Sequence, residues 1–395
     1  MILEYSVGYW KPFLLKIMLN RLKALKKKWL LLGIIFLSVF LRLISINQSF
    51  WLDEATTANV IRNFSLSEII TKFSPGDFHP PLYYLISKVW SIPFGVNEFS
   101  LRILSVIVGS LTVFFLYIIA KKYKGENFGL ISALLLATSP LHIYYSQEAR
   151  MYAMETFFVV ASIYLYQSLL KKEKVTNWIL FSLSLVLIGF TDYLPLLILP
   201  AFFIHSVVIK KNFFWFKKLL ISLLPLFIIF IFWLPIFSKQ LSGGLSVFSD
   251  SPIWWRVLGR FSFKELFLIP LKFVIGRISF FNKILYLFVL LPYIFLFGLL
   301  FLKQKKQLKT LSLPLLWFFV PLLLTVALSF RISVLSYFRL IFILPAFYFF
   351  LSFSIESLKK PIKNIVTVAI ILFNLAFSCI YLFYCLTFFF LDYYL

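Results

Sequence analysis

The chain has 395 residues, 62% of them hydrophobic, and its mean hydropathy is +0.95. Soluble domains contain roughly 45–50% apolar residues, so this composition excludes an ordinary water-soluble fold and predicts an integral membrane protein. The formal charge of +24 does not indicate a nucleic-acid partner, because the basic residues stand in short clusters between apolar runs rather than in one basic domain. The two cysteines, Cys379 and Cys385, both lie in the last apolar run and form no disulfide framework or metal-ligand pattern.

The apolar runs predict an all-α, polytopic transmembrane helix bundle of about eleven helices. A basic segment, 1–28, precedes the first run, which has no small-residue cleavage site and therefore predicts an uncleaved first transmembrane helix. A spanning helix needs about 17–25 mostly apolar residues. Windows of this kind cover 29–46, 101–120, 127–141, 151–170, 175–191, 193–209, 219–237, 284–302, 311–329, 338–355 and 362–385. We expect a catalytic core over 29–210 and further membrane helices over 211–395.

The basic clusters predict the orientation of the bundle. Most of the 39 lysines and arginines fall at 11–28, 121–124, 171–174, 210–218, 303–309 and 359–363, which lie on one side if the N-terminus is cytoplasmic. The positive-inside rule favours this arrangement. It leaves two long outer segments, 47–100 and 238–283, where we expect the chemistry and short interfacial helices, and within the first of them the apolar stretch 80–95 could dip into the interface.

The first outer segment opens with Trp51-Leu52-Asp53-Glu54, which places two adjacent carboxylates just beyond the first helix. Because like charges repel, one of the two could have a raised pKa and act as a base on an acceptor hydroxyl or amine. Alternatively, both could place negative charge at the start of the following helix.

The same segment continues with His79-Pro80-Pro81-Leu82-Tyr83-Tyr84. The two prolines disfavour helix before them and favour a helix start after them, which predicts a fixed turn. His79 could donate a hydrogen bond to a phosphate, ligate a metal or cap the turn.

A third polar stretch runs from Ser139 to Ala153 and includes Glu148, Arg150 and Tyr152. Ionisable residues at a membrane helix end are costly and usually have partners or ligands. Arg150 could form an ion pair with Glu148 or Asp53, or it could grip a donor phosphate with two hydrogen bonds.

Two later stretches carry basic residues near the predicted outer side. Arg331 and Arg339 could meet a phosphate or a lipid headgroup, but they could equally be snorkelling anchors. An aromatic and basic stretch within 238–283 suits an amphipathic helix on anionic headgroups, and could also form an acceptor cleft. Its members are Trp254, Trp255, Arg256, Arg260, Lys264, Lys272 and Arg277.

Taken in order, Trp51-Leu52-Asp53-Glu54, His79-Pro80-Pro81-Leu82-Tyr83-Tyr84 and Ser146-Gln147-Glu148-Ala149-Arg150-Met151-Tyr152-Ala153 resemble the signature set of the GT-C membrane glycosyltransferases. The resemblance is to the branch with protein O-mannosyltransferases, aminoarabinose transferases and lipopolysaccharide-core glycosyltransferases. It is best over about 29–210.

The resemblance implies inverting transfer of a sugar from a polyprenyl-phosphate donor to a lipid, glycan or protein acceptor. Asp53 would be the general base or would position the acceptor, Glu54 would assist it or bind a metal, and Glu148 would position the acceptor or a metal. Arg150 would hold the phosphate, and the remaining substrate contacts would come from His79, Tyr83, Tyr152 and Arg339. The resemblance leaves open whether the enzyme uses a divalent metal. The enzyme would lie in a prokaryotic plasma membrane and act on its extracytoplasmic face.

Two other functions stay open at this point. A transporter or flippase for a lipid-linked saccharide also fits many helices with a few outer charges, but such proteins tend to place substrate groups near the midplane of repeated halves, and no repeat is visible. A polysaccharide polymerase or ligase would also use lipid-linked saccharides. The oligosaccharyltransferases carry a Trp-Trp-Asp acceptor motif, whereas Trp254-Trp255 is followed here by Arg256. Transfer of a whole oligosaccharide to asparagine is therefore disfavoured.

Overall fold

The computed structural model describes residues 25–209, 212–250, 259–280, 282, 284–303 and 310–384, and these residues form helices with no strand among them. The all-α class is therefore confirmed. After a first helix over 25–43, the longer elements are α2 (Leu52–Asn63), α4 (Leu82–Phe94), α5 (Glu98–Lys124), α6 (Glu126–Ala137), α7 (Pro140–Tyr145), α8 (Tyr152–Lys171), α9 (Val175–Thr191), α10 (Leu199–Ile209), α11 (Phe213–Ile221), α12 (Leu224–Asp250), α14 (Phe263–Ile275), α15 (Ile284–Lys303), α16 (Ser312–Leu328), α17 (Leu344–Glu356) and α18 (Lys360–Tyr384).

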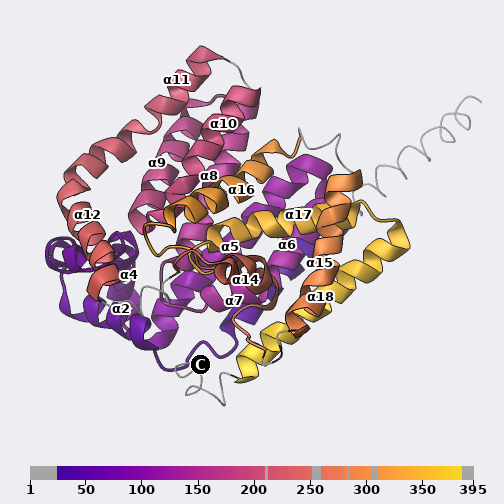
Figure 1. The fold of residues 1–395 in the computed structure, drawn as a ribbon, viewed down its shortest axis with the longest axis horizontal. Coiled ribbons are helices and arrows are strands. Elements are labelled where there is room, and N and C mark those ends of the chain that lie inside the picture. Colours follow the sequence, from indigo (N-terminus) through magenta and orange to yellow (C-terminus); the bar gives the residue numbers. More distant parts are fainter. Residues whose placement is uncertain are drawn as a thin grey trace, which may run out of the picture.

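The bundle is built around α5, which packs on both α6 and α8, while α8 continues the packing onto α9. In Figure 1, α12 lies on one flank and α15 and α18 lie on the other, with α5, α6 and α8 between them. Large apolar side chains on these flanks point outward, including Phe232 on α12 and Phe288 on α15. Lipid rather than water suits such a surface, because its side chains are apolar. The helical backbone can also lie in lipid, since a helix satisfies its own backbone hydrogen bonds.

Several helices have the length and composition of membrane spans. In the part of the chain that the structure describes, four helical stretches are long and apolar enough to cross a bilayer: Glu98–Lys124, Tyr152–Lys171, Phe213–Ser246 and Lys360–Leu382. Shorter apolar helices accompany them, among them Val175–Thr191 and Ser312–Leu328.

Segments predicted to share the cytoplasmic side lie together at one end of the bundle. Lys27 pairs with Glu126 at 3.6 Å, and Lys218 pairs with Glu173 at 2.8 Å, so charges from separate clusters meet there. Lys124 lies over the ring of Phe353, 3.5 Å from its centroid.

The first outer segment folds into α2, the short helical turns α3 (Leu66–Glu68), η1 (Ile69–Phe73) and η2 (Ser74–Gly76), and α4. As the two prolines predict, α4 begins at Leu82, directly after Pro81. Its 13 residues extend for about 20 Å, which is too short to cross a hydrocarbon core of about 30 Å. The stretch 80–95 therefore packs beside the bundle without crossing it.

The second outer segment differs from the expectation. The helix expected to end at 237 is longer, because α12 continues without a break to Asp250. In α14, Lys264 is exposed but Lys272 is buried, and its Nζ donates to the carbonyl oxygens of Arg277 (3.1 Å) and Ile278 (2.7 Å). Interface anchoring is therefore wrong for Lys272, because this end of α14 packs inward against α7. Trp254, Trp255 and Arg256 lie outside the described residues.

A close contact between α5 and the end of α7 depends on Gly109. A Cβ added to Gly109 would lie 2.3 Å from Ser146 Oγ and 2.8 Å from Ser146 Cβ, which is too close for carbon. The absence of a side chain on Gly109 lets the chain around Ser146 approach α5. Small residues serve this purpose at many helix contacts in membranes.

We expect Gly109→Ala to lower the free energy of unfolding by about 1–3 kcal/mol, because the added methyl group must push Ser146 away from α5. Thermal unfolding in detergent, followed by tryptophan fluorescence, measures the change. Gly298→Ala is the matched control, since a Cβ there meets nothing within 4 Å. Equal melting temperatures for the two variants would contradict the packing described here.

Candidate active site

The loop over 146–151, between α7 and α8, is fixed to the scaffold by Gln147, by Ala149 and by the Glu148 carbonyl oxygen, which accepts from Ser105 Oγ at 2.6 Å. The Gln147 side chain donates to the carbonyl oxygens of Ile44 (2.7 Å) and Arg42 (3.2 Å) at the end of the first helix. The Ala149 N–H donates to Glu54 Oε1 at 2.7 Å. These bonds hold the loop backbone and leave the side chains of Glu148 and Arg150 free to face another direction.

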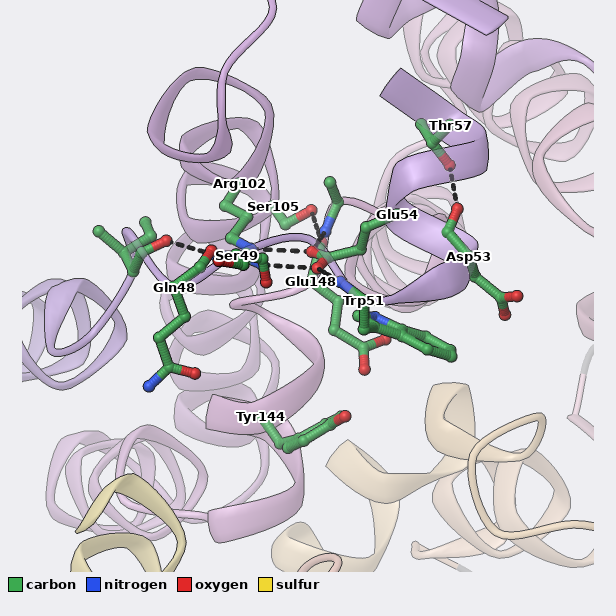
Figure 2. Close-up of polar contacts among 12 residues, drawn as sticks. Gln48, Ser49, Trp51, Asp53, Glu54, Thr57, Arg102, Ser105, Tyr144 and Glu148 are labelled. Carbon is green, nitrogen blue, oxygen red and sulfur yellow. Dashed lines mark hydrogen bonds and ion pairs between the residues drawn. The ribbon is translucent and has the colours of Figure 1, made fainter. Parts of the chain in front are cut away.

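Glu54 is the anchor of this arrangement. Its carboxylate is buried and receives two hydrogen bonds from Arg102, from Nε to Oε1 at 2.8 Å and from Nη2 to Oε2 at 2.5 Å. Arg102 also donates to the carbonyl oxygen of Ile46 at 2.7 Å. Figure 2 shows Arg102 and Glu54 meeting across the gap between α5 and α2. The capping interpretation is partly right for Glu54, because Oε2 also accepts the Trp51 N–H at 3.4 Å.

Asp53 points away from Glu54, because successive helix residues project about 100° apart. It lines a polar cavity of about 650 Å³, and its Oδ2 lies 3.9 Å from Arg150 Nη2. The Asp53 side chain is 43% exposed and that of Arg150 only 8%. Arg150 Nη1 donates to the Tyr84 hydroxyl at 3.2 Å, which fixes the guanidinium in the cavity wall. Of the two ion pairs considered for Arg150, the structure forms the one with Asp53.

Most of the predicted site residues meet at this polar cavity. Those that line it are Asp53, His79, Glu148, Arg150, Tyr152 and Arg339. Tyr152 packs edge-on against Tyr145 and Phe338, and Arg339 donates to the Ser333 carbonyl at 3.0 Å.

Two predicted residues, Glu54 and Tyr83, do not line the polar cavity. Glu54 is engaged by Arg102, as described above. Tyr83 is buried beside Tyr84, with the ring centroids 6.1 Å apart, and it is Tyr84 that lines the cavity. Because neighbouring helix residues point in different directions, the sequence motif identified the right turn of α4 but not the residue that faces the cavity.

Sequence reasoning missed two charged residues of the polar cavity, Asp77 and Asp192. For Arg277 it left interface anchoring and an acceptor cleft open; the guanidinium lies 4.8 Å from the centre of the Tyr144 ring, inside the protein, and the residue lines the polar cavity. Asp192 directly follows the apolar helix α9. A carboxylate at the end of a membrane helix is costly without a partner, so this position carried a usable signal.

The Glu148 carboxylate has unusual surroundings. Both of its oxygens are buried, and Tyr144, Arg277 and Arg150 favour its ionised form. Burial raises the pKa of Glu148 to about 7, although the charge of Arg277 opposes the rise. Glu148 is therefore poised to exchange a proton near neutral pH, and buried groups of this kind gather at functional sites.

Residues 78–238 match the family described as "Dolichyl-phosphate-mannose-protein mannosyltransferase", a region that contains His79, the 146–151 loop and Asp192. An uncharacterised protein of Aquifex aeolicus is 28% identical over 69% of the chain, and the matched region is 52% of that protein. The structure resembles that of ArnT from Cupriavidus metallidurans bound to undecaprenyl phosphate, with a TM-score of 0.57, 14% identity and coverage of 85% of this chain and 60% of that one.

It also resembles the oligosaccharyltransferase AglB from Archaeoglobus fulgidus in complex with an inhibitory peptide and a dolichol-phosphate, with a TM-score of 0.52 and 12% identity. That likeness covers 91% of this chain and 56% of AglB. The chain therefore has the fold of these GT-C membrane proteins. With several helices of membrane-spanning length and composition, it is an integral membrane protein.

The resemblance to GT-C enzymes left a divalent metal open. Among the described residues, no group of three or more His, Cys, Asp or Glu side chains lies close enough to hold a metal ion.

We expect Glu148→Gln to stabilise the protein at high pH and not at low pH. The folded state prefers protonated Glu148, so its contribution to stability is present below the ordinary pKa near 4.5 and is lost as the pH rises through about 7. Above pH 7 the buried charge costs up to about 3 kcal/mol, which glutamine avoids.

Melting temperatures of the wild type and Glu148→Gln, measured in detergent from pH 4 to pH 9, test this prediction. The two curves should converge in acid and separate above neutrality, with the variant more stable. A constant difference across the whole range would contradict the burial of a titrating carboxylate.

Proposed function

We propose that this GT-C chain transfers a sugar from a polyprenyl-phosphate donor to an acceptor on the extracytoplasmic side of the membrane, with inversion at the sugar carbon. The observation that carries the proposal is the meeting of Asp53 and Arg150 in one cavity. This reaction needs both a base and a phosphate-binding cation in one cavity, because the acceptor loses a proton while the phosphate leaves.

The exposure of the two groups suits these roles. The Asp53 carboxylate is accessible, so an incoming acceptor hydroxyl or amine can reach it. Arg150 is almost enclosed and is held by Tyr84, which makes it a preorganised partner for charge that develops during the reaction. A guanidinium can also bind two phosphate oxygens at once.

Two further arginines support a phosphate in the polar cavity. Arg277 and Arg339 both line it. Together with Arg150, they bring three arginine side chains to one cavity. The solved relatives hold undecaprenyl phosphate or dolichol-phosphate on the same fold, which favours a polyprenyl-phosphate donor for this chain as well. Such a donor enters from the bilayer and needs no nucleotide-binding motif.

In the proposed reaction, Asp53 takes the proton of the acceptor while the acceptor oxygen or nitrogen forms a bond with the anomeric carbon. The bond from that carbon to the phosphate oxygen breaks, and the electron pair leaves with the polyprenyl phosphate. Attack from the face opposite the leaving group inverts the anomeric carbon. A general base contributes about 10²–10⁴-fold to the rate of such a step.

The remaining predicted residues take supporting roles in this proposal. Glu54 is a positioning residue, because it holds the start of α2 and the 146–151 loop through Arg102 and Ala149. Glu148 faces the acceptor from within the polar cavity, and the rings of Tyr152 and Tyr84 provide flat surfaces for a sugar. Mass spectrometry of lipid and glycan extracts from a deletion strain identifies the acceptor as lipid, polysaccharide or protein.

We expect Asp53→Asn to insert and fold normally and to reduce sugar transfer by about 10²–10⁴-fold, because the amide cannot take the proton. Transfer is measured in membranes that contain the native acceptor, as radiolabel lost from an added polyprenyl-phosphate sugar and recovered in product. Glu68→Gln is the control, since its exposed carboxylate lies in the same outer segment away from the polar cavity. Sugar transfer by Asp53→Asn at the wild-type rate would show that Asp53 is not the general base.

A further inference from the structure

A second pair of ionisable groups lies in the wall of the polar cavity. His79 Nδ1 and Asp192 Oδ2 are 2.9 Å apart, and both residues line the cavity. His79 stands on the turn before α4, while Asp192 follows α9, so two segments far apart in the chain meet at this bond. The other Asp192 oxygen accepts the Leu194 N–H at 2.9 Å, which fixes the carboxylate.

The bond determines which ring nitrogen of His79 is available. A carboxylate only accepts, so Nδ1 carries the proton that lies between the two groups, and Nε2 is left for a molecule in the polar cavity. The backbone of the turn is held from α12, because Gln240 Nε2 donates to the carbonyl oxygens of His79 (3.0 Å) and Ser74 (2.7 Å). Tyr193 in turn donates to Gln240 Oε1. The imidazole is thus oriented by its side-chain partner and by its own backbone.

The carboxylate of the pair is held as an anion. Burial alone would raise the pKa of Asp192, but the hydrogen bond and charge of His79, the Leu194 N–H and the charge of Arg339 together lower it. Asp192 therefore faces the ring as an acceptor for the Nδ1–H. The other ionisable groups around the pair are Asp77 on the same turn, Tyr193 beside Asp192, and Glu155 on α8.

We propose that His79, held by Asp192, is the general acid that protonates the leaving phosphate. This inference rests on the proposed function. His79 Nε2–H gives its proton to the phosphate oxygen as the bond from that oxygen to the anomeric carbon breaks, while Asp53 takes the acceptor proton. The polyprenyl phosphate leaves as a monoanion, His79 becomes neutral and Asp53 becomes protonated, so charge and protons balance. Solvent returns the Asp53 proton to His79 after release. Asp192 acts through His79 and is a positioning residue.

The test uses diethyl pyrocarbonate, which modifies only the unprotonated ring nitrogen of histidine. The chain has three histidines, and His142 and His205 are buried, so mass spectrometry can follow His79 separately. We expect Asp192→Asn to move the midpoint of His79 modification to lower pH by about 1–3 units, because the neutral amide no longer stabilises imidazolium. The control Glu68→Gln should keep the wild-type midpoint.

The second arm adds undecaprenyl phosphate as the probe. It should slow the modification of His79 in the wild type, because Nε2 faces the phosphate. Equal midpoints in the wild type and Asp192→Asn, or no protection by undecaprenyl phosphate, would overturn the acid role of His79. Asp53→Asn should keep the wild-type midpoint and the protection. Failure of the proposed function would appear instead as normal transfer by Asp53→Asn, so the two failures are distinguishable.

Discussion

The candidate site depends on one buried carboxylate, that of Glu54. It binds the guanidinium of Arg102 with two hydrogen bonds and accepts the backbone N–H of Ala149. Burying a charge is costly unless it is paired and hydrogen-bonded, and here both oxygens have strong donors. Because Glu54 is on α2, Arg102 on α5 and Ala149 between α7 and α8, this one interaction joins three separate parts of the bundle.

Neighbouring side chains point in different directions, and this links the Glu54 anchor to the polar cavity. In the adjacent pair Asp53 and Glu54, Glu54 faces the scaffold while Asp53 faces the polar cavity. The same separation occurs in the loop, where Gln147 and Ala149 bind the scaffold and Glu148 and Arg150 line the cavity. Each of the two short polar motifs therefore contains residues that bind the scaffold and residues that line the cavity. The residues that bind the scaffold determine where the cavity residues lie.

The sequence was sufficient to predict the parts of the fold that depend on composition. The apolar windows located the helices, and the prolines located the start of α4 at Leu82. Asp53, Glu148 and Arg150 were also predictable, because charged residues at the ends of membrane helices are costly and usually functional. The structure brings these three residues together at one cavity.

Features that depend on long-range packing were not predictable. The bond between His79 and Asp192 joins residues 113 positions apart, and no local pattern indicates it. The choice between Tyr83 and Tyr84 depends on the rotation of α4, and the burial of Arg277 depends on the inward packing of α14. The continuation of α12 to Asp250 was missed because polar residues after 237 resemble a loop in composition, although they remain helical.

Glu54→Gln tests the central claim most directly, because glutamine keeps the size of the side chain but cannot pair with Arg102. The measurement combines the melting temperature with the rate of sugar transfer from a polyprenyl-phosphate donor. We predict a loss of about 3–5 kcal/mol in stability, as expected when a buried ion pair is broken, together with reduced transfer although Asp53 is intact. A Glu54→Gln protein with the wild-type melting temperature and the wild-type rate would contradict the account.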